Sequence, residues 1–174
     1  MLNNKKVYII GFMGSGKTTT GMKLAALLGW TFTDLDKCLV ERTGMTIPEI
    51  FSNHGETYFR KAESEALRSL KTLTNSVIST GGGTPCYGDN MDYMLETGLT
   101  IYLKLTPGQL KSRLSGTDGK RPLIKDLGDE DLLNFIKVKL ELREKWYKRA
   151  ELTVNGFDTD IRLIYSQVLS RLGA

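Results

Sequence analysis

The sequence predicts an α/β fold with three layers: a central parallel sheet of about five strands, built around a P-loop and flanked by helices. Three observations lead to this prediction. Residues 11–18, Gly-Phe-Met-Gly-Ser-Gly-Lys-Thr, match the phosphate-binding pattern G-x4-G-K-[ST] at every defined position. Short apolar segments alternate with helical ones, an order typical of parallel sheets covered on both faces. No repeat or linker divides the 174 residues, so we expect one domain over residues 1–174.

The first predicted strand covers residues 7–10 and leads directly into the P-loop. After the loop, residues recur at helical spacing up to a stop signal at Gly29: Thr20, Leu24, Leu27 and Leu28. The loop glycines let N–H groups turn inward around phosphate oxygens, and the helix N-terminus adds partial positive charge. We therefore expect a nucleoside triphosphate to bind through Gly14, Ser15, Gly16, Lys17, Thr18 and Thr19. Lys17 would reach the β- and γ-phosphates, and the Thr18 hydroxyl would ligate Mg²⁺.

The remaining strands are predicted at residues 30–33, 77–80, 100–105 and 152–154. Three helix starts carry recognisable signals. Thr46-Ile47-Pro48-Glu49 forms a capping box with proline in the first turn, Thr106-Pro107 begins another helix, and Asp129 opens a long amphipathic one. Between the last two starts lies a loop-like stretch, Ser115 to Gly128, that is rich in Gly, Asp and Lys.

Composition narrows the class of protein. Hydrophobic residues make up 40% and charged residues 25%, as in soluble globular proteins, and no apolar run approaches the roughly 20 residues that span a bilayer. No signal peptide is visible, and Cys38 and Cys86 form no CxxC pair, so we expect a cytoplasmic protein. Residues 137–149 hold six basic and two acidic residues, which accounts for the whole net charge of +4. That distribution favours a small anionic substrate over nucleic acid.

A P-loop needs a carboxylate that organises a metal ion, usually at the end of another strand. The second predicted strand ends in Asp34-Leu35-Asp36, and alternate residues of an extended segment point the same way. One carboxylate can orient Mg²⁺ while the other accepts a proton from a substrate hydroxyl. A turn or a helix cap is the alternative use of these aspartates.

Other candidate residues follow the third strand and lie on helices. Three consecutive glycines, Gly81-Gly82-Gly83, favour close approach of backbone N–H groups to a ligand over a flexible turn. Arg143 falls within the apolar face of the last long helix, where it needs a carboxylate or phosphate partner or must reach water. Arg60 and Arg121 are open between a ligand-binding role and solvent exposure.

In combination these elements resemble the shikimate kinase family. The ordered matches cover almost the whole chain: residues 11–18, Asp-Leu-Asp at 34–36, Thr43-Gly44, Ile47-Pro48-Glu49-Ile50-Phe51, Gly55-Glu56, Phe59-Arg60, residues 81–83, Arg121-Pro122-Leu123 and the Arg143 helix. The resemblance implies ATP-dependent phosphorylation of the shikimate 3-hydroxyl, in aromatic amino-acid biosynthesis. It also implies a fold like that of nucleoside monophosphate kinases, with a substrate-binding section at about residues 34–62 and a mobile lid at about 115–128.

The same resemblance assigns roles to residues. Asp34 would organise Mg²⁺, and Asp36 would bind the reacting hydroxyl and act as its base. Arg60 and Arg143 would hold the shikimate carboxylate, helped by backbone at Gly82 and Gly83. Arg121 would be the lid arginine that contacts ATP phosphates, and Arg113 resembles the family's adenine-stacking arginine. The adenine-side loop departs from the family: it reads Asn155-Gly156-Phe157-Asp158 where a proline is frequent.

Two other functions share the P-loop. A gluconate-type kinase is the nearest enzymatic alternative, but the DxD followed by three glycines disfavours it. A GTP-dependent switch usually carries Asn-Lys-x-Asp, whereas the nearest match here, Asn4-Lys5-Lys6-Val7, precedes the P-loop and lacks the aspartate. We therefore expect a shikimate kinase that acts as a monomer and binds neither nucleic acid nor membrane.

Overall fold

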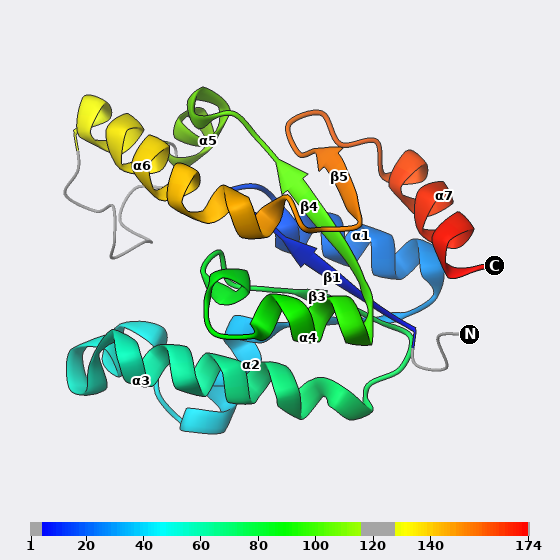
Figure 1. Cartoon of the computed structure of the whole chain (residues 1–174), viewed down its shortest axis with the longest axis horizontal. Helices are drawn as coiled ribbons and strands as arrows, with labels where there is room; N and C mark the ends of the chain where they lie inside the picture. Colours follow the sequence, from blue (N-terminus) through cyan, green and yellow to red (C-terminus); the bar gives the residue numbers. More distant parts are fainter. Residues whose placement is uncertain (1–4, 116–127, 174) are drawn as a thin grey trace.

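The computed structural model describes residues 5–115 and 128–173. Within them, strands and helices alternate along the chain (Figure 1): β1 Lys6–Ile10, α1 Lys17–Leu28, β2 Thr31–Asp34, α2 Leu35–Thr43, α3 Ile47–Ser69, β3 Ser76–Ser79, α4 Asn90–Thr97, β4 Leu99–Lys104, α5 Pro107–Leu114, α6 Asp129–Tyr147, β5 Leu152–Asn155 and α7 Ile161–Leu172. Two short 3-10 helices, η1 Leu70–Thr72 and η2 Thr84–Cys86, flank β3. The predicted α/β class is confirmed, and every predicted strand is present with its ends shifted by one residue at most.

The five strands form one parallel sheet in the order β2-β3-β1-β4-β5. β1 lies in the middle, with Val7 opposite Val77 of β3 and Leu99 of β4. All five residues of β1 are buried, which explains why its sequence is a continuous apolar run after Lys6. Because the strands are parallel, the loops that follow β1, β2 and β3 all leave the same edge of the sheet, where ligands bind in open α/β folds.

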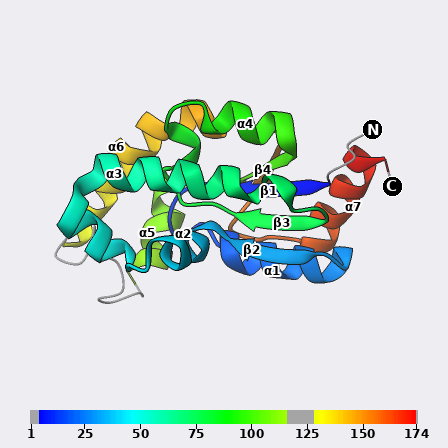
Figure 2. The ribbon, with the colours of Figure 1, turned by 90° about the horizontal axis from the view of Figure 1, so that it is seen from below.

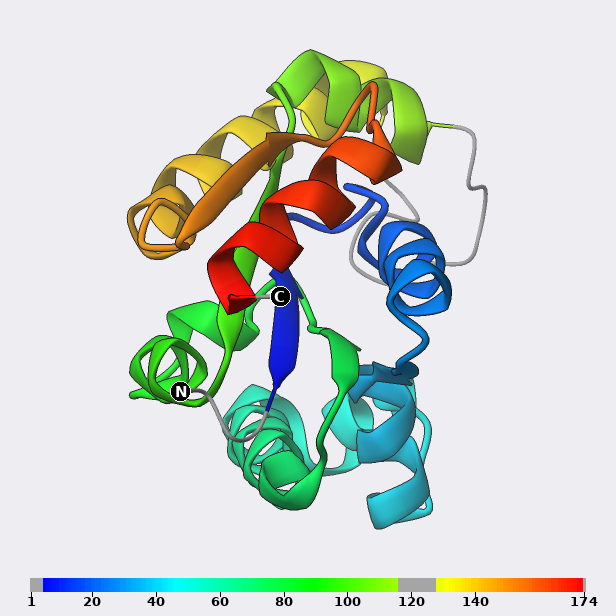
Figure 3. The ribbon, with the colours of Figure 1, turned by 90° about the vertical axis from the view of Figure 1, so that its right-hand side faces the viewer.

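Helices cover both faces of the sheet, as predicted. α1 and α7 pack side by side over one face (Figures 1 and 3), against Val7 and Ile9 of β1. α3 and α4 lie over the opposite face (Figure 2) and, with α6, pack against Tyr8 and Ile10. The alternation of side chains along β1 thus divides the interior into two cores.

The predicted helix signals are confirmed. Thr46 and Thr106 each cap their helix through a complete capping box, and Gly29 ends α1 in the left-handed conformation with φ 65°. The residues predicted at helical spacing after the P-loop all lie on α1, where Leu24 is buried and Leu27 is 44% exposed. None of the helices in the described ranges combines the length and the apolar character that crossing a bilayer requires.

Candidate active site

The P-loop connects the end of β1 to the start of α1. Gly11, Gly14 and Gly16 have φ values of 143°, 78° and 92°, which L side chains rarely adopt. Space is also restricted there, because a Cβ on Gly14 would lie 2.8 Å from Leu114 Cδ2. The first turn of α1 has no side-chain cap, so its N–H groups are oriented to receive an anion.

A cavity of about 470 Å³ opens beside this loop, and we call it the P-loop cavity. It is lined by Met13, Gly14, Gly16, Lys17, Thr18, Thr19, Asp34, Asp36, Ser79, Thr80, Gly81, Gly82, Arg113 and Leu114. The structure thus gathers the P-loop, the aspartate pair and the three-glycine segment around one space. Of the predicted nucleotide-binding residues in the loop, Ser15 alone does not line it. Its hydroxyl is buried and has no hydrogen-bond partner among the described residues.

Lys17 is only 8% exposed at the start of α1. Its Nζ donates hydrogen bonds to the backbone carbonyls of Gly11 and Phe12, each at 2.9 Å. The ammonium group is therefore held by the loop itself, at the wall of the P-loop cavity. A cation in this position can stabilise negative charge that develops on a transferred phosphoryl group.

Asp34 connects the P-loop to the next helix. Its Oδ2 accepts a hydrogen bond from Thr18 Oγ1 at 3.3 Å, and its Oδ1 accepts from the backbone N–H groups of Asp36 and Lys37 as the N-cap of α2. The alternative use as a helix cap is thus present, and the same side chain also reaches the P-loop helix at Thr18. The predicted reason for the pairing was wrong: β2 ends at Asp34 and Leu35 begins a helix, so Asp34 and Asp36 do not alternate along an extended segment.

Asp36 nevertheless lines the same cavity, from the first turn of α2. Burial raises the pKa of its carboxyl to about 6, and the neighbouring carboxylates of Glu63 and Asp34 add to this shift. Lys17 and Arg60 act in the opposite direction. A carboxyl group with a pKa near neutrality can accept a proton and still be ionised at neutral pH.

A second cavity of about 390 Å³, the arginine cavity, is lined by Glu56, Thr57, Arg60, Gly83, Cys86, Tyr87 and Arg143. Arg60 comes from α3 and Arg143 from α6, and their guanidinium groups lie over the rings of Phe59 and Phe12 at 5.0 and 5.5 Å. Two arginines around one small space offer paired recognition of a carboxylate. Burial also raises the pKa of the Cys86 thiol to about 11, so the thiol is neutral.

The basic excess of residues 137–149 faces this cavity only in part. Arg143 lines it, whereas the other basic side chains of that segment, Lys137, Lys139, Lys145, Lys148 and Arg149, are exposed. Of this segment Arg143 alone lines the arginine cavity, and it is the residue that the apolar-face argument singled out.

The glycines at 81–83 lie between the two cavities. None of them has a positive φ, so backbone conformation does not require glycine there. Space does. A Cβ on Gly81 would lie 2.6 Å from Glu63 Oε1, and one on Gly83 would lie 2.5 Å from both terminal nitrogens of Arg60. On Gly82, a Cβ would be 3.3 Å from a guanidinium nitrogen of Arg143 and from the Met13 backbone nitrogen.

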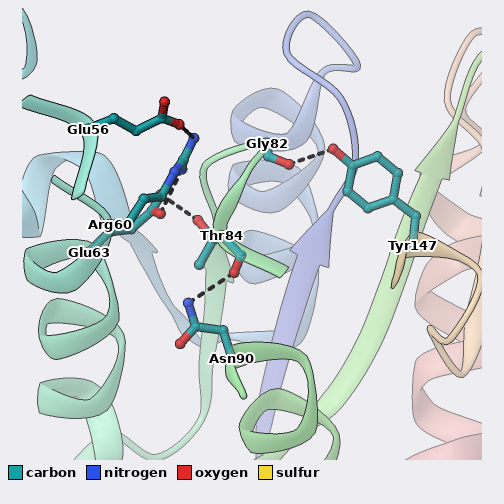
Figure 4. A network of polar contacts seen from close by, with 7 residues as sticks. All are labelled: Glu56, Arg60, Glu63, Gly82, Thr84, Asn90 and Tyr147. Atoms are coloured by element: carbon teal, nitrogen blue, oxygen red, sulfur yellow. Dashed lines mark hydrogen bonds and ion pairs between the residues drawn. The ribbon is translucent and has the colours of Figure 1, made fainter. Parts of the chain in front are cut away.

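Glu63, which sequence reasoning missed, organises this region (Figure 4). The carboxylate is 1% exposed and accepts hydrogen bonds from Arg60 at 2.9 Å and from the Thr84 hydroxyl at 2.6 Å. Asn90 in turn donates to the Thr84 carbonyl at 2.9 Å. The sequence does contain a signal for Glu63, because it lies on the same face of α3 as Phe59, Ala66 and Leu67, all of which are buried. A charged residue on an apolar helical face is the same signal that singled out Arg143.

A positive φ at Gly55 interrupts α3 and thereby sets the direction from which Arg60 enters the site. Gly55 has φ 78° and ψ 177°, a conformation essentially confined to glycine. The second part of the helix carries Glu56 and Arg60, whose side chains approach to 3.4 Å.

Arg113 of α5 also lines the P-loop cavity. It donates to the carbonyls of Ser15 at 3.0 Å, Gly156 at 2.8 Å and Phe157 at 3.1 Å. A third cavity of about 220 Å³ opens there and includes Arg113 and Phe157 in its lining. Arg121 and most of the predicted lid at 115–128 lie outside the described residues.

The fold and the site together define a P-loop kinase: a P-loop beside a pair of aspartates, next to a cavity lined by two arginines. A family model described as shikimate kinase matches residues 13–173. A shikimate kinase of Parabacteroides distasonis is 40% identical over 94% of this chain and 93% of its own length. The chain belongs to the shikimate kinase family, and it is an ATP-dependent kinase.

Solved structures of shikimate kinases have the same fold as this chain. A shikimate kinase from Bacteroides thetaiotaomicron superposes with a TM-score of 0.90 and 35% identity, covering 98% of this chain and 99% of the other. A second shikimate kinase, from Acinetobacter baumannii and in complex with shikimate, superposes with a TM-score of 0.83 and 31% identity. That match covers 98% of this chain and 94% of the other. The predicted fold class, including the P-loop architecture, is thereby confirmed.

Proposed function

We propose that this chain transfers the γ-phosphoryl group of ATP to the 3-hydroxyl of shikimate, giving 3-phosphoshikimate and ADP, the family's activity in aromatic amino-acid biosynthesis. One observation carries the proposal: the P-loop cavity and the arginine cavity adjoin at consecutive residues, Gly82 lining the first and Gly83 the second. A phosphoryl donor and a carboxylated acceptor bound on the two sides would be close neighbours, which is what direct transfer needs.

On the nucleotide side, we assign the phosphates to backbone N–H groups of Gly14, Ser15 and Gly16 and to Lys17. Lys17 would exchange its hydrogen bonds to the loop carbonyls for bonds to phosphate oxygens. Thr18 and Thr19 would contact the phosphates from the first turn of α1. The Arg113 guanidinium, beside the cavity that includes Phe157, supports a place for the adenine ring.

Mg²⁺ fits between the same elements. The Thr18 hydroxyl and the Asp34 carboxylate, 3.3 Å apart, are oxygen ligands at the wall of the P-loop cavity. Magnesium is usually bound by one or two protein oxygens together with substrate phosphates and water. We therefore assign the ion to Thr18 and Asp34, where it would neutralise charge on the phosphates when bound.

On the acceptor side, Arg60 and Arg143 would bind the shikimate carboxylate from two directions. The Gly82 and Gly83 N–H groups have no protein acceptor among the described residues, which supports their use as donors to the acceptor. Asp36 would bind the 3-hydroxyl and take its proton as transfer proceeds. Its raised pKa of about 6 suits this role, because the carboxylate is basic yet ionised at neutral pH.

The remaining assignments rest on the sequence. We propose a single domain over residues 1–174, with a substrate-binding section at about 34–62 and a lid at about 115–128 whose Arg121 closes onto the phosphates. We also propose a cytoplasmic monomer. The free state of Cys38 and Cys86 supports a reducing compartment.

A coupled assay of ADP formation tests the proposed function. The wild-type chain is incubated with ATP and Mg²⁺ alone, with shikimate, and with gluconate, and the product is analysed by phosphorus–proton NMR correlation. We expect ADP formation that depends on shikimate and a phosphate on its 3-oxygen. Equal ADP formation without any acceptor, or turnover with gluconate but not shikimate, would contradict the proposal.

A further inference from the structure

Tyr147, the last residue of α6, lines neither cavity but makes a polar contact with the segment between them. The side chain is fully buried, and its ring packs on Tyr102 of β4 with 5.1 Å between centroids. Its hydroxyl oxygen lies 2.5 Å from the Gly82 carbonyl oxygen. Because a carbonyl has no proton, the tyrosine must be the donor. Burial raises the pKa of Tyr147 well above its ordinary value, so the donor proton stays in place throughout the working pH range.

This hydrogen bond fixes the orientation of one peptide group in the three-glycine segment. The described chain contains no cis peptide, and in a trans peptide the C=O and the following N–H point in opposite directions. Holding the Gly82 carbonyl toward Tyr147 therefore turns the Gly83 N–H away from it. In Figure 4, Tyr147 and Arg60 lie on opposite sides of Gly82, and Gly83 and Arg60 line the arginine cavity together.

The same tyrosine contacts the arginine that completes the cavity. Arg143 is four residues earlier on α6, hence on the same helical face, and its positive charge counteracts part of the rise in the pKa of Tyr147. One of its guanidinium nitrogens would lie 3.3 Å from a Cβ on Gly82. Tyr147 thus holds the peptide that carries the Gly83 N–H and lies one helical turn from Arg143, and Gly83 and Arg143 line the arginine cavity together.

Side-chain hydrogen bonds also hold Thr84, which directly follows the three glycines. Glu63 of α3 accepts a hydrogen bond from the Thr84 hydroxyl, and Asn90 of α4 donates to the Thr84 carbonyl. The backbone adds two turn hydrogen bonds, from the Thr84 N–H to the Gly81 carbonyl at 3.2 Å and from the Cys86 N–H to the Gly83 carbonyl at 3.0 Å. These bonds hold the peptides on either side of Gly82–Gly83, and Tyr147 holds the Gly82 carbonyl itself (Figure 4).

We propose that Tyr147 is a positioning residue for the acceptor, which aims the Gly83 N–H and the Arg143 guanidinium at the acceptor carboxylate. The inference rests on the proposed function, in which that carboxylate belongs to shikimate. Because Gly83 and Arg143 both line the arginine cavity, we expect the loss of the Tyr147 hydroxyl to act on acceptor binding. Loss of such binding raises KM for the acceptor and leaves kcat unchanged.

The chain supplies a matched control in Tyr102. Its hydroxyl is also buried, yet among the described residues it has no hydrogen-bond partner. Tyr147→Phe and Tyr102→Phe therefore remove the same atom from two rings that touch each other, and only one of these atoms makes a hydrogen bond. Any effect of simply losing a buried hydroxyl should appear in both variants.

The test compares steady-state constants of the two variants with those of the wild-type chain. We expect Tyr147→Phe to raise KM for shikimate by about 5- to 100-fold, as for a lost buried hydrogen-bond partner, with kcat and KM for ATP within about twofold. Tyr102→Phe should match wild type in all three. Equal shikimate KM values in the two variants, or a fall in kcat with unchanged KM in Tyr147→Phe, would overturn the inference.

A second measurement covers a variant too unstable for kinetics. Hydrogen exchange in the ligand-free chain should be faster at residues 81–86 in Tyr147→Phe than in Tyr102→Phe, while α1 keeps equal protection in both. Equal exchange at residues 81–86 would overturn the inference. Activity of the wild-type chain separates this test from the proposed function: wild type without shikimate turnover removes the function itself, whereas an active wild type with an unchanged Tyr147→Phe removes only the role of Tyr147.

Discussion

The two glycine-rich segments of the site use glycine for different physical reasons. In the P-loop, Gly11, Gly14 and Gly16 have positive φ values, so glycine there permits a backbone conformation that presents N–H groups to phosphate. In residues 81–83 no φ is positive, and glycine instead leaves room for Glu63, Arg143 and Arg60. The nucleotide side is therefore built mainly from backbone, and the acceptor side mainly from side chains that arrive from distant helices.

This difference determines which substitutions should impair each side. A loop built from its own backbone depends on a few adjacent residues, whereas a pocket built from α3 and α6 depends on contacts that are far apart in the sequence. Variants that affect one side should therefore leave the other largely intact. Asp36 is the exception, because it lines the P-loop cavity while its carboxylate would lie 3.2 Å from a Cβ on Gly81.

The largest loss is expected for Asp36→Asn, at the meeting point of the two sides. An amide cannot take the proton of the acceptor hydroxyl, so kcat should fall by about 10²–10⁴-fold. Steady-state kinetics at saturating ATP and shikimate measure this, with the exposed Asp92→Asn as the control. In the wild-type chain, kcat/KM for shikimate should fall as the pH drops through about 6, where Asp36 becomes protonated. Near-normal turnover of Asp36→Asn would remove Asp36 from the mechanism.

Lys17→Ala should come next and should affect the nucleotide side alone. Removing a charge that stabilises the transferred phosphoryl group costs about 10²–10³-fold in kcat in comparable sites. The dissociation constant for shikimate, measured by calorimetry without nucleotide, should stay unchanged, as should every constant of the exposed control Lys61→Ala. Weakened shikimate binding in Lys17→Ala would show that the two sides are not separate.

Arg143→Ala and Arg60→Ala should affect the acceptor side and differ from each other. Each should weaken shikimate binding by about 10- to 150-fold, the equivalent of about 1.5–3 kcal/mol for a charged hydrogen-bond partner, and change ATP affinity little. Arg60→Ala should also lower Tm, because it leaves Glu63, 1% exposed, with an unpaired buried charge. Calorimetry measures the affinities for shikimate and ATP, and thermal unfolding measures Tm. The exposed Arg42→Ala is the control. Lost ATP affinity with intact shikimate affinity would reverse the assignment.

The smallest effect concerns stability and has the opposite sign. The pKa of Asp36 in the folded chain, about 6, lies above its ordinary value of 3.8. The folded state then binds more protons between these values, so the wild-type chain loses stability as pH rises through about 6. Asp36→Asn avoids this cost, and at pH 7.5 its Tm should be a few degrees higher, at about 2–4 °C per kcal/mol for this size. The gain should vanish near pH 4, and a lower Tm at pH 7.5 would contradict the shift.

The sequence predicts most of this fold because its signals are local. A buried strand followed by glycines and a capped helix is defined within a few residues, and the same holds for the capping boxes at Thr46 and Thr106. The P-loop residues were predicted in this way, since positive-φ glycines and a lysine at fixed spacing describe one backbone shape. Neither the sheet order nor the cavity volumes follow from such local patterns.

The acceptor side was harder to predict because its partners meet only in the folded chain. The glycines at 81–83 were predicted to approach a ligand, and they lie between the two cavities, but nothing nearby in the sequence indicates that Glu63 and Arg60 occupy the space beside them. The buried stripe of α3 does contain Glu63, so a search for charges on apolar helical faces finds it. The contact between Tyr147 and Gly82 joins residues 65 positions apart, and an aromatic residue on an apolar face gives no sign of it.

Calorimetric titration of Gly83→Ala and Gly16→Ala, each with shikimate and with a non-hydrolysable ATP analogue, tests the contrast between the two segments most directly. A methyl group on Gly83 meets the Arg60 guanidinium, whereas one on Gly16, with φ 92°, strains the P-loop. Gly83→Ala should weaken shikimate binding by at least about tenfold, equivalent to 1.4 kcal/mol, and leave the analogue's affinity unchanged. Gly16→Ala should do the reverse. Loss of both ligands in both variants would contradict two separately built sides.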